Sequence, residues 1–206
     1  MAEAVRAVRK AANSGLAPSS LGAAEDDLLM RRIAEGDRVA MQQAYNRFHR
    51  PVVAYLARLV RDHAVAEELA SEVLVGVWRQ AARYEGRSSL ETWVFGIAHH
   101  KAVSWLRKRR DEGMAEGAAE ALVDERPDPE ANAGDRSMAG LMARLIARLP
   151  AEQQAALQLT YYQEMPLEEV AEAMGCPVNT VKTRMYYARQ HLKKMLAAEG
   201  IQALAA

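Results

Sequence analysis

Polar and cationic side chains of the kinds that bind DNA are concentrated in the second half of the segment 166–194. Amides and hydroxyls can hydrogen-bond base edges in the major groove, and cations can neutralise backbone phosphates. The candidates for these contacts are Asn179, Thr180, Lys182, Thr183, Arg184, Tyr187 and Arg189. The segment therefore predicts sequence-directed binding to duplex DNA.

Two helices joined by a tight turn would position these side chains. Pro166 can begin the first helix at no hydrogen-bond cost, and Val170, Ala171 and Met174 recur at helical spacing. Residues 175–177, Gly-Cys-Pro, would end that helix and start the next. The apolar side chains of the second helix that can face inward are Val181, Met185, Ala188 and Leu192. This is the pattern of a helix-turn-helix, although an ordinary helical hairpin with a solvated basic face is the alternative for this segment alone.

A second group of candidate residues combines aromatic rings with cations between residues 84 and 110. Trp93 and Trp105 offer stacking surfaces for exposed bases, and the run Arg107–Arg110 offers charge for phosphates. This mixture favours binding to single-stranded or melted nucleic acid. Alternatively, the tryptophans pack in the core and the terminal cations complement the helix dipole.

Catalytic and metal-binding signatures are not found in the sequence. There is no HExxH zinc motif, Walker loop or GxSxG elbow, and the neighbours His99 and His100 would point about 100° apart on a helix, which argues against joint metal ligation. The single cysteine, Cys176, excludes an internal disulfide and is expected to be a small turn residue rather than a redox switch. We therefore expect no enzyme activity and no cofactor.

Composition predicts an all-α protein without membrane insertion. Ala, Leu, Arg, Glu and Met are abundant, whereas Phe, Ile and Gly are sparse, which favours helices throughout the 206 residues. No apolar run approaches the roughly 20 residues that span a bilayer, and the first residues lack a signal-peptide core. The expected location is the cytoplasm.

The zero net charge conceals an uneven distribution along the chain. The segments 1–24, 25–110, 111–135 and 136–206 carry net charges of +2, +4, −8 and +2. The acidic segment contains two prolines and three glycines and has little apolar periodicity, so it cannot bury enough surface to fold alone. We therefore predict a mobile amino-terminal tail (1–24), two small helical domains (25–110 and 136–198) joined by a flexible acidic linker (111–135), and a carboxy-terminal tail (199–206).

Four helices are expected in the upstream domain. A short helix over 26–35 is followed by Gly36-Asp37, where the aspartate can cap a second helix. The second helix repeats apolar residues on one face, which should be buried: Met41, Tyr45, Phe48, Val52, Leu56 and Leu59. The third helix, over 62–83, has an apolar face and an acidic cluster that the helix dipole would favour: Glu67, Glu68 and Glu72. A loop over 84–89 leads to the last helix, over 90–110.

These motifs and their order resemble those of an extracytoplasmic-function (ECF) sigma factor of the sigma-70 family, the kind with regions 2 and 4 only. DHAVAEELASEVLVGVW resembles the helix that docks on the polymerase clamp. EGRSSLETWVFGIAHHKAVSWLRKRR resembles the promoter-melting and −10 recognition segment, and residues 147–196 resemble the −35 recognition domain. The resemblance implies a transcription initiation factor that is stress-responsive and controlled by an anti-sigma factor.

The resemblance also implies a role for each candidate residue. An acidic surface would bind the clamp of the largest subunit of core RNA polymerase through Asp62, Glu67, Glu68 and Glu72. The loop and last helix would bind the −10 region through Tyr84, Arg87, Ser88, Ser89, Trp93, His99, His100, Lys101, Ser104 and Arg107. The seven residues of the helix-turn-helix named above would bind −35 DNA, and the flap of the second-largest subunit is a further expected contact.

Departures from the family pattern concern specificity. Ser71 and Leu74 replace a common glutamine and phenylalanine, His99-His100 replaces a frequent Arg-Asn, and Tyr187 stands where many relatives carry a cation. Two other classes stay open at this point. A helix-turn-helix regulator acting without polymerase would need a ligand pocket in 26–110, and a nucleic-acid-processing enzyme would need carboxylates arranged with His and Lys.

Overall fold

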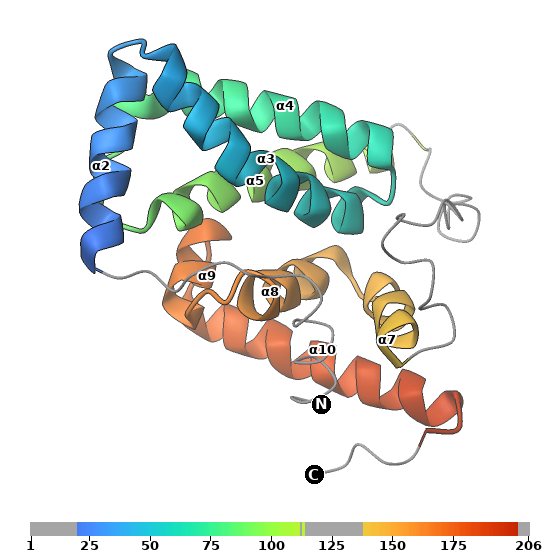
Figure 1. The fold of residues 1–206 in the computed structure, drawn as a ribbon. Helices are drawn as coiled ribbons and strands as arrows, with labels where there is room; N and C mark the ends of the chain where they lie inside the picture. Colours follow the sequence, from blue (N-terminus) through green and yellow to red (C-terminus); the bar gives the residue numbers. More distant parts are fainter. Residues whose placement is uncertain (1–19, 112, 114–137, 202–206) are drawn as a thin grey trace. The chain divides into compact units, whose positions relative to one another are not determined.

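The computed structural model describes residues 20–111, 113 and 138–201, and those residues are almost entirely helical. Eight α-helices and one short 3-10 helix are present, with no strand among these residues. The elements are α2 (Ser20–Ala34), α3 (Arg38–Val60), α4 (His63–Gln80), η1 (Ala81–Arg83), α5 (Leu90–Asp111), α7 (Met138–Ala147), α8 (Ala151–Tyr161), α9 (Leu167–Ala173) and α10 (Val178–Ala198) (Figure 1). The predicted all-α fold class is confirmed.

Two compact units make up the chain, one containing α2 to α5 and the other α7, α8, α10 and most of α9. The predicted tails (1–24 and 199–206) and the acidic linker (111–135) lie mostly outside the described residues, so the domain boundaries stay predictions. None of the helices in the described ranges has the length and apolar character required to cross a bilayer.

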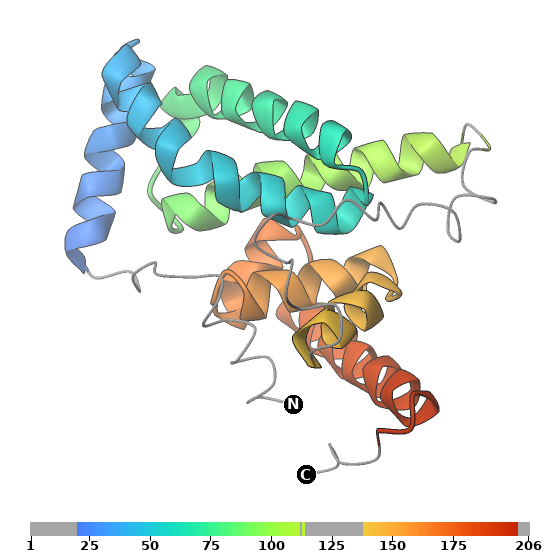
Figure 2. The same cartoon turned by 45° about the vertical axis from the view of Figure 1, so that its right-hand side comes forward.

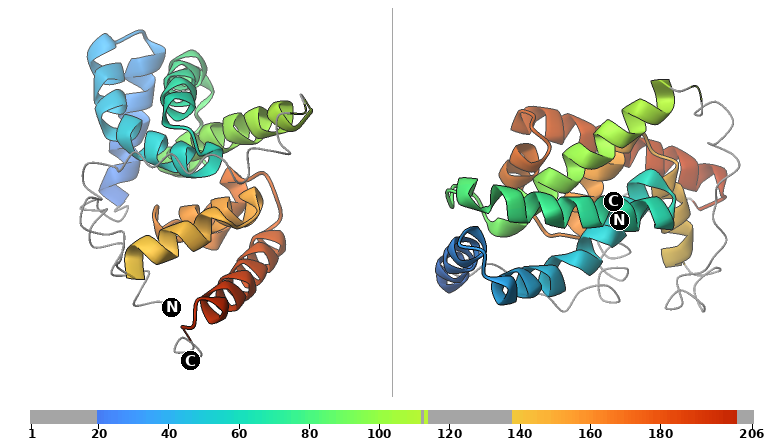
Figure 3. Two further views of the ribbon diagram at one scale, coloured as in Figure 1. Left: turned by 90° about the vertical axis from the view of Figure 1, so that its right-hand side faces the viewer. Right: turned by 90° about the horizontal axis from the view of Figure 1, so that it is seen from above.

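In the upstream unit, α3 and α4 pack side by side and both contact α5, while α2 packs against α3, α4 and η1 (Figure 1, Figure 3). The core includes Phe48, Leu56, Val73 and Phe95, each at most 2% exposed. Burying one such side chain contributes about 1.5–3 kcal/mol relative to leaving it in water. This burial holds α5, which carries most of the predicted −10 residues, against α3 and α4.

Asp37 caps α3 as the sequence predicts, its carboxylate accepting hydrogen bonds from the backbone N–H groups of Val39 and Ala40. Hydrogen bonding from the Arg32 guanidinium, at 2.7 Å, holds the pKa of Asp37 below its ordinary value. The start predicted for α2, Asp26, is wrong, since the helix begins at Ser20. Alanines at 23 and 24 favour helix, so it extends upstream of the apolar residues that suggested it.

The apolar face predicted for α3 is only partly buried. Phe48, Val52, Leu56 and Leu59 lie in the core, but Tyr45 is 41% exposed, so its assignment to the core is wrong. Met41 is half-buried. The apolar stripe of α3 thus continues beyond the core onto the surface of the unit.

In the downstream unit, α10 packs against α8 and α7 (Figure 2). The predicted helix-turn-helix is present: α9 begins directly after Pro166, and Pro177 directly precedes α10. Gly175 has a positive φ of 60° in the turn, a conformation that favours glycine. All the apolar residues predicted to face inward from these two helices are buried: Val170, Ala171, Met174, Val181, Met185, Ala188 and Leu192.

Candidate nucleic-acid interface

The exposed face of α10 carries polar side chains but few charges at its centre. Because successive residues turn by about 100°, the face opposite Val181, Met185 and Ala188 contains Asn179, Thr183, Tyr186, Tyr187 and Gln190. All five of these side chains are exposed, and the cations Lys182 and Arg189 are exposed at one edge of the face. Residues able to contact bases are therefore flanked by residues able to contact phosphates.

Two predicted −35 residues are less accessible. Thr180 is half-buried. The Arg184 side chain is 25% exposed, and its guanidinium pairs with Glu152 of α8 at 2.8 Å and donates to the Cys176 Sγ at 3.3 Å. Arg184 therefore fixes α10 to its own domain, and we remove it from the set expected to contact DNA. Cys176 serves as a turn residue, as predicted.

Tyr186 is a candidate that the sequence reasoning missed. Its side chain is 57% exposed, and its ring makes an edge contact with Tyr187 at a centroid distance of 5.4 Å. The spacing of Asn179, Thr183, Tyr186 and Gln190, at intervals of four, three and four residues, could have identified this face from sequence.

The loop before α5 is fixed by hydrogen bonds within the unit. The Tyr84 hydroxyl donates to the Ser88 carbonyl at 2.9 Å, and the Tyr84 ring contacts the Trp93 ring edge at 5.5 Å. The Ser89 Oγ accepts from the Thr92 N–H at 3.1 Å and lies 2.8 Å from the Thr92 Oγ1, so Ser89 caps α5. Ser89 is thus a structural residue, whereas Arg87 is exposed and available to a partner, with an exposed ion pair to Glu85.

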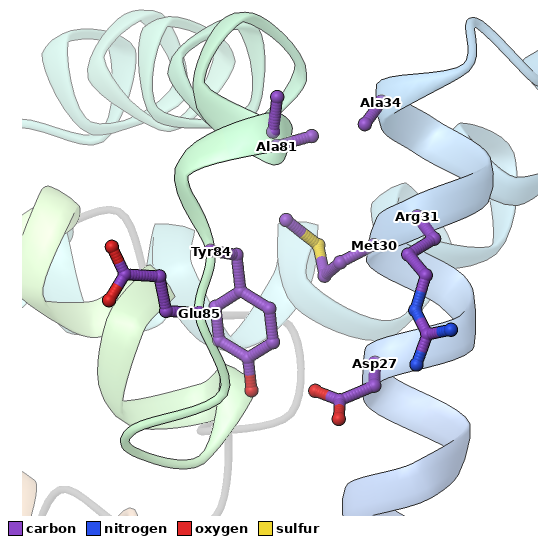
Figure 4. Close-up of a pocket in the computed structure, with 8 residues that line it drawn as sticks. Asp27, Met30, Arg31, Ala34, Ala81, Tyr84 and Glu85 are labelled. Carbon is purple, nitrogen blue, oxygen red and sulfur yellow. The ribbon is translucent and has the colours of Figure 1, made fainter.

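A pocket of about 240 Å³ lies between this loop and α2 (Figure 4). Its polar lining comes from Asp27, Arg31, Tyr84 and Glu85. Burial, with the nearby carboxylates of Asp26 and Asp27, raises the pKa of Tyr84 to about 12, so the hydroxyl stays a neutral donor. Asp27 and Arg31 were not predicted, because sequence alone does not show that α2 faces the loop.

Contact between α2 and the loop requires a glycine in the loop. Gly86 has a positive φ of 66°, and a Cβ at this position would lie 2.8 Å from the Asp27 Oδ1. A side chain at Gly86 would therefore both strain the backbone and displace Asp27.

On α5, one predicted residue is buried and four of the other five follow a single face, whereas Lys101 lies to one side of that face, where it pairs with Glu72. His99 is 3% exposed and its Nδ1 is hydrogen-bonded to the Tyr55 hydroxyl at 3.0 Å, so the prediction that it contacts DNA is withdrawn. One side of the helix carries four of the predicted residues, at intervals of seven, four and three residues: Trp93, His100, Ser104 and Arg107. Trp93 is half-buried and the other three are exposed.

The predicted acidic surface is divided among three local roles. Asp62 caps α4 by accepting from the Val65 N–H at 3.1 Å, so it is a structural residue. Glu67 lies 3.2 Å from the His49 Nε2 on α3, and Glu72 pairs with Lys101 on α5. Glu68 is exposed, and within the described ranges no ion-pair partner is found for it.

An exposed apolar groove lies beside these acids and was also missed from sequence. It has a volume of about 370 Å³, and its lining residues are Met41, Tyr45, Ser71, Leu74, Val75, Trp78 and Arg79. Trp78 and Val75 are 40% and 47% exposed, which is unusual for large apolar side chains. Ser71 lies one helical turn from Glu67 and Glu68, so the groove and the acids are continuous on α4.

Clusters of His, Cys, Asp or Glu able to hold a metal ion are not found in the part of the chain that the structure describes. The surfaces described above present hydrogen-bond donors, cations and aromatic rings. Their chemistry suits binding to nucleic acid and to a partner protein.

Comparison with known proteins gives matches across both units. Residues 44–112 match sigma-70 region 2, and residues 139–192 match sigma-70 region 4. The ECF RNA polymerase sigma factor SigK of Mycobacterium ulcerans is 32% identical over 181 residues, covering 84% of this chain and 95% of that protein. RNA polymerase sigma factor YlaC of Bacillus subtilis is 27% identical, covering 76% and 92%.

Solved structures with the same fold include two complexes. CnrH, in complex with the cytosolic domain of CnrY, superposes with a TM-score of 0.61 at 21% identity, covering 84% of this chain and 97% of that chain. The sigma factor RpoE of Bartonella quintana, in complex with the anti-sigma factor NepR, superposes with a TM-score of 0.59 at 23% identity, covering 76% and 96%. The sequence matches favour a sigma factor over a regulator that acts without polymerase. The chain therefore belongs to the ECF sigma factors of the sigma-70 family, which are transcription initiation factors for RNA polymerase.

Proposed function

We propose that this sigma factor reads its promoter with two separate surfaces, α5 with its preceding loop at the −10 element and α10 at the −35 element. The observation that carries the proposal is the exposed face of α10, with hydrogen-bonding and aromatic side chains at its centre and Lys182 and Arg189 at its edge. Such a face suits the major groove of duplex DNA.

The −10 surface has the composition needed for a melted strand. Trp93 supplies an aromatic ring beside the loop, and His100, Ser104 and Arg107 continue along the same side of α5. Stacking of bases on aromatic rings is worth about 1–3 kcal/mol per base, and cations add the phosphate contribution. Lys101 lies at the edge of this surface. The loop before α5 would meet an extruded base through Tyr84, Arg87 and Ser88.

Core RNA polymerase would bind on α3 and α4. Glu68 and Glu72 are the exposed carboxylates of the predicted acidic surface, and Glu68 has no ion-pair partner within the described ranges. The adjacent groove with Tyr45 and Trp78 offers apolar area that would be removed from water on docking. The partner here would be the clamp of the largest subunit, and the α7–α10 domain would bind the flap of the second-largest subunit. A protein working with RNA polymerase would act in the cytoplasm.

An anti-sigma factor is the expected regulator. CnrH and RpoE of B. quintana were both solved with partner proteins bound, and NepR is described as an anti-sigma factor. By this analogy, a partner that occupied the α3–α4 groove would hold the present sigma factor inactive until a stress signal released it.

Transcription in vitro with core RNA polymerase tests the proposed function. The protein should co-purify with core and start transcripts at promoters mapped by run-off sequencing, and changes in either promoter element should reduce initiation. Failure to bind core, or initiation that does not depend on both elements, would refute it.

A further inference from the structure

On the exposed face of α10, a patch formed by Thr183, Tyr186 and Tyr187 lies between the polar residues Asn179 and Gln190 along the helix. Thr183 lies roughly opposite the buried Val181 and Ala188, with the two tyrosines on either side of it. The tyrosines are 57% and 52% exposed, and their rings meet edge to face at 5.4 Å and 74°. Two large aromatic side chains are therefore held together in solvent at the middle of a helix that carries cations elsewhere.

Thr183 contributes its methyl group to this patch. Its hydroxyl donates to the carbonyl oxygen of Asn179, one turn earlier in the same helix, at 2.9 Å. Since the hydroxyl hydrogen is already used in this bond, the side chain offers a ligand its methyl group and an acceptor oxygen, but no donor. The methyl group and the two rings are neighbours on the helix surface, at spacings of three and four residues within the first half of α10.

The surroundings of the patch indicate which ligand it would meet. Lys182 and Arg189 are exposed along one edge, where they suit a phosphate backbone, whereas Arg184 at the other edge is held by Glu152. In the major groove of DNA the apolar group that distinguishes one base from the others is the C5-methyl of thymine. An apolar patch bordered by cations is therefore complementary to a groove wall that presents thymine methyl groups.

We propose that Thr183, Tyr186 and Tyr187 read thymine methyl groups in the −35 duplex. This rests on the proposed function, because α10 must lie in the major groove for the patch to reach them. It also gives Tyr187 a use other than phosphate binding, at the position where the sequence departs from the cation common in the family.

Deoxyuridine substitution tests the proposal, because it removes the methyl group and leaves base pairing unchanged. Holoenzyme binding is measured on a promoter mapped for this protein, with each −35 thymine replaced in turn by deoxyuridine. Burial of one methyl group predicts about fourfold weaker binding at one or more positions. The variants Thr183→Ser, Tyr186→Ala and Tyr187→Ala should weaken binding to the thymine duplex and reduce its advantage over the deoxyuridine duplex.

Lys182→Ala is the matched control, since it should weaken binding to both duplexes by the same factor. Thr183→Ser keeps the hydroxyl and loses one methyl group, so it preserves the helix and guards against a folding artefact. Indifference of the wild-type holoenzyme to every deoxyuridine substitution would overturn the thymine proposal while leaving −35 recognition intact. Absence of any dependence on the −35 duplex would instead refute the proposed function, and this proposal with it.

Discussion

At the scale of single residues, Tyr84 shows how a loop side chain can be fixed by its surroundings. Its hydroxyl donates to the Ser88 carbonyl, and burial together with Asp26 and Asp27 raises its pKa to about 12. The side chain is therefore neutral near pH 7, and its hydrogen bond and ring contact join Ser88 in the loop to Trp93 of α5.

The Tyr84→Phe variant should change the alkaline pH dependence of stability. The pKa of a tyrosine in the unfolded chain is about 10, so the folded protein holds the Tyr84 hydroxyl proton more tightly than the unfolded chain does. The resulting contribution to the free energy of unfolding is fully present below about pH 10 and is lost as the pH rises to about 12. The loss should be on the order of 1 kcal/mol, because solvent screens a half-buried hydroxyl. Urea unfolding of both proteins between pH 8 and about 12 measures it, and parallel stability curves would contradict the assignment.

Arg184 and Glu152 give a second prediction at this scale. Because the pair holds α10 against α8, Arg184→Met or Glu152→Gln should each lower the free energy of unfolding by about 1 kcal/mol. The double variant should lose less than the sum of the two, since both changes remove one interaction. Urea denaturation measures all four proteins. If the losses in the two single variants add up to the loss in the double variant, the ion pair contributes no coupling energy. If Arg184→Met leaves the free energy of unfolding unchanged but weakens DNA binding, Arg184 belongs among the residues that contact DNA.

Individual residues were also where sequence reasoning was least complete. His99 has the same chemistry as His100, and only the packing of α5 against α3 shows that one ring is buried against Tyr55 and the other is exposed. Ser89 and Arg184 have suitable groups for DNA but use them within the protein. Residue type shows what a side chain can bind, whereas tertiary contacts decide whether it is available.

At the scale of elements, α4 joins a structural face to a binding face. Its apolar side builds the core through Val73 and Val77, while its other surfaces carry Glu68 and the apolar groove with Trp78. The neighbouring acids are each tied to another helix, Glu67 to α3 and Glu72 to α5. Glu68 is thus the member of the predicted acidic surface that has no ion-pair partner within the described ranges.

Charge reversal at Glu68 should separate polymerase binding from DNA binding. Glu68→Arg should weaken binding to core polymerase by about tenfold, because an attractive charge becomes repulsive at the proposed interface. Binding of the free protein to a −35 duplex should be unchanged. Glu35→Arg, at another exposed acid outside α4, is the control with the same charge change. Equal loss of core and −35 binding by Glu68→Arg would indicate unfolding and remove Glu68 from the interface.

The groove on α3 and α4 gives a parallel prediction. Trp78→Ala should weaken core binding by tenfold or more, as expected for a central aromatic anchor. The melting temperature should fall little, because Trp78 is already 40% exposed. Val39→Ala is the matched control, since Val39 is a 64% exposed apolar residue outside the groove. Calorimetric titration with core polymerase measures the effect, and equal affinities for the two variants would exclude the groove.

Local signals predicted the elements well. The cap at Asp37, the break at Gly175 and the helical spacing of apolar residues all depend on neighbours in sequence, so α3, α9 and α10 could be identified from it. The groove and the pocket beside Tyr84 could not, because each combines side chains of two separate elements whose packing the local sequence does not show. The exposed Tyr45 belongs to an apolar stripe that sequence cannot divide into core and surface.

At the scale of the whole molecule, the two proposed nucleic-acid surfaces belong to two different helical units. The upstream unit offers rings and cations along α5, and the downstream unit offers the polar and aromatic face of α10. Both units carry a positive charge in sequence, over 25–110 and 136–206, while the acidic segment 111–135 accounts for the neutral total. A neutral protein can therefore still present basic surfaces to DNA at two places.

The division of labour between these surfaces is tested most directly by a crossed binding measurement. Two variant holoenzymes are titrated with a −10 non-template single strand and with a −35 duplex. The α5 variant carries His100→Ala and Arg107→Ala, and the α10 variant carries Lys182→Ala and Arg189→Ala. The α5 variant should lose affinity for the single strand and keep it for the duplex, and the α10 variant should do the reverse. Loss of both ligands by either variant, at unchanged melting temperature, would contradict a promoter read by two separate surfaces.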